Sequence, residues 1–145
     1  MAMALASVAS RVPDCIVGLR EQIIDNAITL FPAVVRLHRN NVATKMRPDS
    51  EAFSVIIVAS RNSDRNHDYG HMSYQAKVNW PDAHGNDIVA ASAVREDTVE
   101  GALRTLLDLL AVALWGDGRK TCHREIDRTY GLGYEFGEVN RSLTG

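Results

Sequence analysis

The chain has 145 residues, of which 46% are hydrophobic and 23% are charged, and its formal net charge is −2. These values are typical of one globular domain that is large enough to bury a core. The small net charge gives no bulk attraction to nucleic acid or to a membrane, and no apolar run is long enough to span a bilayer.

Residues 1–12 are predicted to be a flexible N-terminus. The stretch from Met1 to Ser10 is apolar but has no basic region before it, so we expect no secretory signal peptide. Cys15 and Cys122 are the only cysteines, and their wide separation favours two reduced thiols. These features together predict an intracellular, cytoplasmic protein.

A first helix is predicted from Pro13 to Phe31, because apolar residues recur there at helical spacing. The apolar stripe consists of Ile16, Leu19, Ile23, Ala27, Ile28 and Phe31. Pro32 should end or kink this helix, and Ala33–Arg39 is expected to add another turn or two. The segment Pro48–Ser50 is predicted to be a linker.

Three strands are predicted after this linker. Phe53–Ser60 is apolar on both faces, whereas Tyr74–Trp80 alternates between apolar and polar residues, which is typical of a half-buried strand. A turn at Pro81–Asn86 then leads into a strand at Ile88–Val94. The short connections favour an antiparallel meander.

The last predicted helix ends at Trp115. Asp97 is predicted to be its N-cap, with Glu100 completing a capping box. Leu106 and Leu107 are expected at the centre of the core between helix and sheet. The predicted fold class is α+β: a two-layer sandwich, helix–three-stranded antiparallel sheet–helix, forming a single domain over residues 13–116 with a C-terminal extension over residues 117–145.

The strand at Phe53–Ser60 needs a cover on its second face, because helices cover only one face of a two-layer sandwich and an apolar edge strand invites aggregation. The tail offers apolar residues at period two, a strand pattern; the alternative is a disordered tail. We hypothesise that residues 129–139 lie on the sheet, in the same chain or across a homodimer, and hide this face. The candidate interface residues are Val55, Ile57, Tyr130, Tyr134 and Phe136.

The order helix, three strands, helix over Pro13–Trp115 resembles the double-stranded-RNA-binding domain. That family contacts phosphates from a lysine-rich start to its last helix. The matching positions here, Arg95 to Glu100, have three acidic residues against one basic residue and would repel phosphate. The resemblance therefore implies a member used for protein contacts, or an unrelated protein of the same shape.

Two polar clusters are candidate binding sites. The basic residues Arg36, Arg39, Lys45 and Arg47 could contact nucleic acid or another anion, and the alternative is an ordinary solvated helix end. His67, Asp68 and His71 have side chains that ligate zinc or iron, and the alternative is a solvated loop at Arg61–Gly70.

No catalytic motif stands out, so the sequence favours a non-catalytic protein-interaction module that self-associates as a homodimer, without a cofactor and without a membrane partner. Two alternatives remain open. One is a nucleic-acid-binding module that uses the basic residues, and the other is a small enzyme or ligand-binding protein with a pocket between sheet and helices.

Overall fold

The computed structural model describes residues 14–62, 71–82, 84–115, 131–134 and 136–144. The described elements are, in chain order, α2 (Asp14–Leu30), α3 (Pro32–Asn40), the 3-10 turn η1 (Asp49–Ala52), β1 (Ser54–Asn62), β2 (His71–Pro81), β3 (Asp87–Ala93), α4 (Val99–Trp115), β4 (Gly131–Tyr134), β5 (Gly137–Asn140) and the 3-10 turn η2 (Arg141–Leu143). The predicted α+β class is confirmed.

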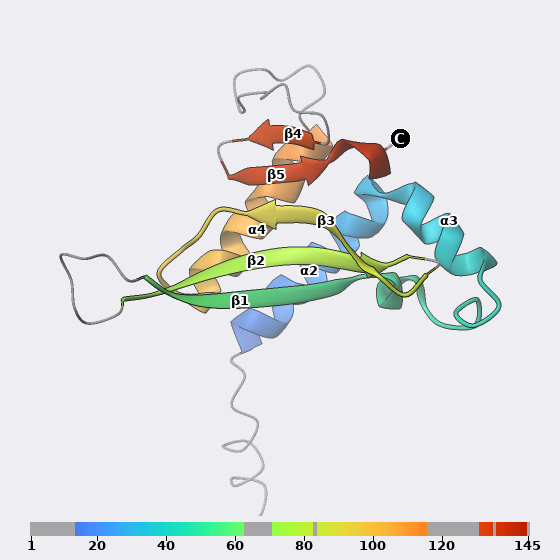
Figure 1. The fold of residues 1–145 in the computed structure, drawn as a ribbon, viewed down its shortest axis with the longest axis horizontal. Coiled ribbons are helices and arrows are strands. Elements are labelled where there is room, and N and C mark those ends of the chain that lie inside the picture. Colours follow the sequence, from blue (N-terminus) through green and yellow to red (C-terminus); the bar gives the residue numbers. More distant parts are fainter. Residues whose placement is uncertain (1–13, 63–70, 83, 116–130, 135, 145) are drawn as a thin grey trace, which may run out of the picture.

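The strands form one antiparallel sheet in the order β1-β2-β3-β5-β4. Helices α2 and α4 lie on the same face of this sheet, and no described element lies on the opposite face (Figure 1). We call that opposite face the open face. The helices contact each other as well as the sheet, with α2 against β1 and α4 against β2, β3 and β5.

Most of the predicted stripe is buried: Leu19, Ile23 and Ala27 of α2, and Phe31 directly after it, lie in the core. Ile16 and Ile28 are partly buried against it. Pro32 occupies the first turn of α3, where its missing N–H costs no hydrogen bond. The ring of Phe31 lies 6.0 Å from the ring of Phe53, which comes just before β1. The break between α2 and α3 is therefore fixed by burial of Phe31 against the start of the sheet.

Helix α4 is capped one residue later than predicted. The hydroxyl oxygen of Thr98, not the carboxylate of Asp97, accepts the hydrogen bond of the Gly101 N–H, at 2.9 Å. With Thr98 as N-cap, the third helical position is Gly101, so Glu100 is not placed to complete a capping box. Its carboxylate accepts a hydrogen bond from Arg104 at 2.9 Å.

The centre of the core differs slightly from the prediction. Leu106 is fully buried, together with Leu103, Leu109 and Leu110, whereas Leu107 is only partly buried against the cluster. The helical spacing places Leu106 on the stripe that faces the sheet, and Leu107 falls at its margin.

Within one chain, the described part of the tail does not lie on the second face of the sheet, which contradicts the same-chain form of the hypothesis. Strand β5 pairs with β3, and β4 pairs with β5, so the hairpin extends the far edge of the sheet and leaves the face near β1 open. Val139 of β5 is fully buried in the core. The expected strand around Tyr134 and Phe136 is not continuous, because β4 ends at Tyr134 and β5 begins at Gly137.

Gly137 sits where β5 crosses close to β3. Its φ of +145° is one that L-residues with a side chain rarely adopt, and a Cβ there would collide with the carbonyl oxygen of Ser92. Only glycine fits this junction.

We therefore predict that Gly137→Ala destabilises the protein by about 2 kcal/mol or more, because it adds both backbone strain and a clash. Gly18→Ala is the matched control. Gly18 lies in α2, and a Cβ added there would meet no neighbouring atom within 4 Å, so we expect about 0.5–1 kcal/mol of stabilisation. Urea unfolding followed by circular dichroism measures both, and equal midpoints for the two variants would contradict the role of Gly137.

A second prediction separates the two central leucines of α4. Leu106→Ala should lower the free energy of unfolding by about 2–5 kcal/mol, because it leaves a cavity in the buried core. Leu107→Ala should cost clearly less, because Leu107 is already partly exposed. Thermal melts of both variants test this order, and a larger loss for Leu107→Ala would mean that α4 packs through a different face.

Candidate interaction surface

Strand β1 forms one edge of the sheet. It pairs with β2 along all nine of its residues, and no other described strand pairs with its outer side. An edge of this length presents a row of backbone N–H and C=O groups to a partner strand.

The backbone groups that point outward can be identified from the neighbouring strand. The N–H of Tyr74 donates to the carbonyl of Glu96, and the N–H of Glu96 donates to the carbonyl of Tyr74, both at 2.8 Å. The polar backbone atoms of Tyr74 therefore point away from β1. Because Ala59 is its direct partner, Ala59 and Tyr74 form a non-hydrogen-bonded pair. It follows that Val55, Ile57 and Ala59 direct their N–H and C=O groups to the free edge.

The side chains of β1 leave apolar surface on both faces. Val55 and Ile57 are partly buried against the core on the helix side. Ile56 and Val58 alternate with them and so lie on the open face, where Val58 is 38% exposed. The surface offered by the predicted interface residues Val55 and Ile57 is thus limited to the part that the core leaves uncovered.

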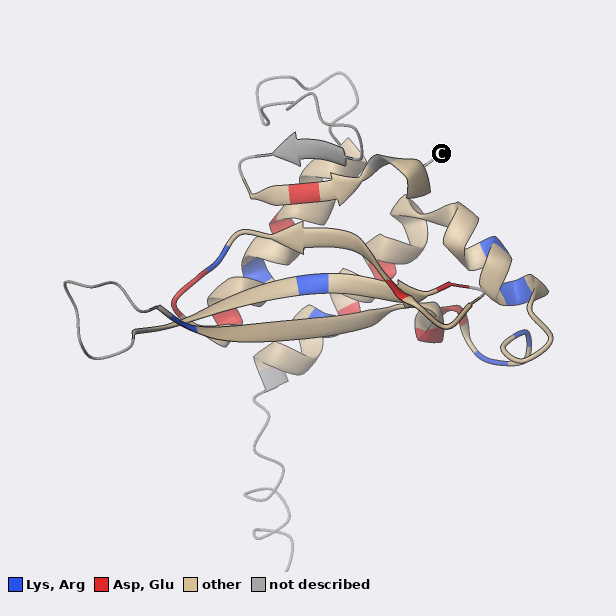
Figure 2. Ribbon diagram, viewed as in Figure 1, with Lys and Arg blue, Asp and Glu red and all other residues tan. Residues whose placement is uncertain are grey.

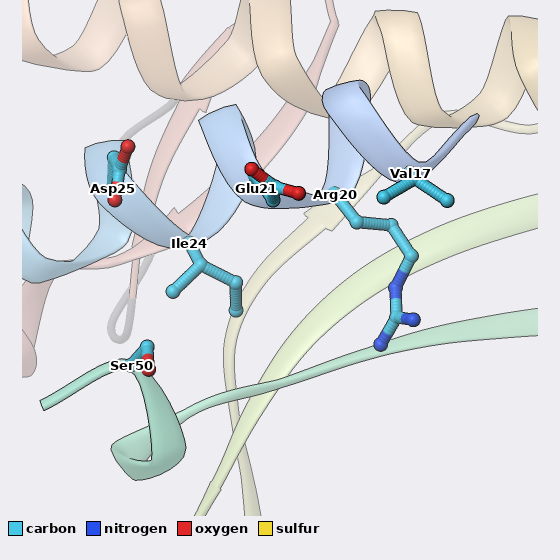
Figure 3. A pocket seen from close by; sticks show the side chains of 6 residues that line it. All are labelled: Val17, Arg20, Glu21, Ile24, Asp25 and Ser50. Carbon is cyan, nitrogen blue, oxygen red and sulfur yellow. The ribbon is translucent and has the colours of Figure 1, made fainter. Parts of the chain in front are cut away.

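A groove of about 300 Å³ flanks β1 on its helix side. It is lined by one face of α2 and by Ser50 of η1; the lining residues are Val17, Arg20, Glu21, Ile24, Asp25 and Ser50. Figure 3 shows Ile24 directed towards Ser50 and Arg20 extended from α2 in the direction of the sheet. The apolar part of the groove is formed by Val17 and Ile24.

The devices that usually protect an edge strand are missing from most of β1, because its one charged residue, Arg61, lies next to its last residue. From Ser54 to Ser60 the strand has no charged residue and no proline, and its pairing with β2 runs without a bulge. The charges on the sheet lie mainly on other strands and at the strand ends (Figure 2), including Lys77 in β2 and Glu138 in β5. The free edge is therefore well suited to pair with a neutral, apolar strand.

Two of the four residues of the predicted basic cluster form ion pairs with neighbouring acids. Arg36 and Lys45 are exposed, but Arg39 forms an ion pair with Asp49, with Nε 2.9 Å from Oδ1. This hydrogen bond lowers the pKa of Asp49 and raises that of Arg39. Arg47 lies 3.9 Å from Glu51. The acids come from η1, directly after the stretch that contains the four cations, so the structure neutralises two of them locally.

The other predicted site residues lie largely beyond the described part of the chain. His67, Asp68 and Tyr130 are outside the described residues. His71 and Tyr134 are described only as backbone positions in β2 and β4. Phe136 is partly buried against the core, where it supports the β4–β5 hairpin.

The groove residues Val17 and Ile24 were not predicted from the sequence. They share one side of α2 at a spacing of seven residues, next to the main apolar stripe. This pair of apolar residues beside the main stripe was the feature of the sequence that could have indicated the groove.

Comparison with known proteins adds no family or homologue. No protein-family model, no curated protein sequence and no solved structure matches this chain. The resemblance to the double-stranded-RNA-binding domain therefore stays a prediction. Among the described helices, none is both long and apolar enough to cross a membrane.

Proposed function

We propose that this protein is a non-catalytic interaction module that pairs with a second copy of itself along β1. The observation that carries the proposal is the free edge of β1, where Val55, Ile57 and Ala59 direct backbone groups outward and where Ser54–Ser60 has no charged residue and no proline. Pairing would join two sheets into one continuous sheet across a two-fold axis.

A second copy suits this edge for three reasons. Two identical strands pair antiparallel when a two-fold axis relates them, and each presents the same surface. With the axis near Ile57, Val55 lies opposite Ala59 and Ile56 lies opposite Val58, so apolar residues meet apolar residues. No like charges are brought together between Ser54 and Ser60.

The groove beside α2 would extend the interface on the helix side. In an antiparallel pair the helix-side residues of both strands lie on the same side of the joined sheet. Val55 and Ile57 of one copy would therefore approach Val17 and Ile24 of the other. A strand edge with one small groove is a modest interface, so we expect association that depends on concentration.

Ala59→Pro tests this mode of pairing. Ala59 is exposed, and its N–H points to the free edge, so proline removes an intermolecular donor without removing a hydrogen bond to β2. Sedimentation equilibrium over a concentration series should show a monomer–dimer equilibrium for the parent chain of 16.0 kDa, and a monomer for Ala59→Pro over the same range.

Val89→Lys is the matched control. Val89 is as exposed as Val58 and lies on the open face of β3, away from the free edge. It should dimerise like the parent. Thermal melts must show that both variants remain folded. A parent that stays monomeric at every concentration would overturn the proposal, and loss of the dimer in Val89→Lys alone would assign association to the open face instead.

A further inference from the structure

A second cavity, separate from the β1 edge, lies where α3 and the loop after it meet the turn between β2 and β3. Its volume is about 490 Å³, which lies within the usual range for small-molecule sites. We call it the Trp80 pocket. Its wall and rim are formed by Val34, Leu37, His38, Asn40, Asn41, Thr44, Ala52, Trp80, Pro81, Asp82 and Gly85.

The inner part of the Trp80 pocket is apolar. Val34 and Ala52 are buried in the core, and Trp80 is partly buried at the end of β2. Leu37 is 55% exposed, a large apolar side chain left in contact with solvent next to the cavity. A hydrocarbon group or an aromatic ring would remove this surface from water.

The wall formed by the loop after α3 is held in place by His38. Its ring nitrogen Nε2 donates to the backbone carbonyls of Arg47, at 3.3 Å, and Pro48, at 3.1 Å. The hydroxyl of Thr44 donates to the carbonyl of His38 at 2.8 Å. These contacts connect the loop to α3, so a ligand would meet a shape that already exists.

Asp82 is the one Asp, Glu, Lys or Arg among the described residues that line the pocket. Its Oδ1 accepts the backbone N–H groups of His84 and Asn86, both at 2.8 Å. These bonds lower the pKa of Asp82, and the bond from Asn86 has the largest effect. The carboxylate is therefore charged at neutral pH. Its Oδ2 accepts neither bond.

None of the four cations of the basic cluster, Arg36, Arg39, Lys45 and Arg47, is among the residues that line the pocket. Arg39 lies on the same helix as Leu37 and His38, but its guanidinium is paired with Asp49 of η1. The pocket therefore combines an apolar interior, the indole ring of Trp80 and one carboxylate. Its lining also includes the polar side chains of His38, Asn40, Asn41 and Thr44.

We propose that the Trp80 pocket binds a small organic cation with an apolar body, such as an aryl or alkyl amine. The ammonium group lies against the Asp82 carboxylate, where a charge-assisted hydrogen bond forms. The apolar body lies against Val34, Leu37 and Trp80. The indole ring adds attraction for the cation through its negative face.

Three probes of the same shape and different charge test this site: benzylammonium, benzyl alcohol and benzoate. Each is titrated into ¹⁵N-labelled protein, and the indole N–H signal of Trp80 reports binding. Only two tryptophans are present, so a Trp115→Phe variant assigns the signal. We expect benzylammonium to bind roughly threefold to tenfold more tightly than benzyl alcohol, and benzoate to bind most weakly.

Asp82→Asn should abolish the preference for benzylammonium over benzyl alcohol, because the charge is lost while an amide oxygen can still accept the two backbone bonds of the turn. The matched control is Asp87→Asn, which removes a nearby exposed charge that does not line the pocket; it should keep the preference. The proposal is overturned if no probe shifts the Trp80 signal, if the alcohol or benzoate binds as well as the amine, or if folded Asp82→Asn keeps the preference.

Discussion

The packing of α2 and α4 side by side on one face of the sheet is the constraint on which the rest of this structure depends. Each helix buries one apolar stripe against the strands and against the other helix, and the fully buried leucines of α4, with Ile23 of α2, form the centre of that contact. Since both helices are used on the same side, the described chain has nothing left to place over the other face (Figure 1). The surface chemistry of that face and of the sheet edges is therefore decided by the strands themselves.

The two edges of the sheet differ in the length of their outer strands. On one side, the short strands β4 and β5 continue the sheet beyond β3, and Gly137 allows β5 to approach the backbone at Ser92. Short outer strands limit the row of backbone groups that remains unpaired. On the other side, β1 is long, regular and uncharged along most of its length. This asymmetry directs association to one edge of the sheet.

Local patterns in the sequence were sufficient to predict most of the elements, because periodicity of 3.6 or 2 depends only on neighbours along the chain. The stripe from Leu19 to Phe31 and the alternation from Tyr74 to Trp80 are of this kind.

The position of the tail in the sheet could not be predicted in the same way. The pairing of Val139 with Ala91 joins distant parts of the chain, and a period-two pattern states that a strand exists without stating its partner. The edge role of β1 was predicted from the meander order of the strands, but the direction of its backbone groups required the contact between Tyr74 and Glu96. The ion pair of Arg39 with Asp49 was likewise hidden, since it depends on how η1 folds back towards α3.

The burial of Val139 has a consequence for the order in which this domain assembles. The hairpins β1–β2 and β2–β3 join strands that follow each other in the chain, so their loops close at small entropic cost. Strand β5 can take its place only after α4 and the segment beyond it have been made and brought back to β3. Strand β5 therefore joins the core last. Until Val139 packs there, Ala91 and the leucines of α4 lack one of their neighbours. During synthesis, a chain at that stage exposes apolar surface at the very edge that the finished molecule protects.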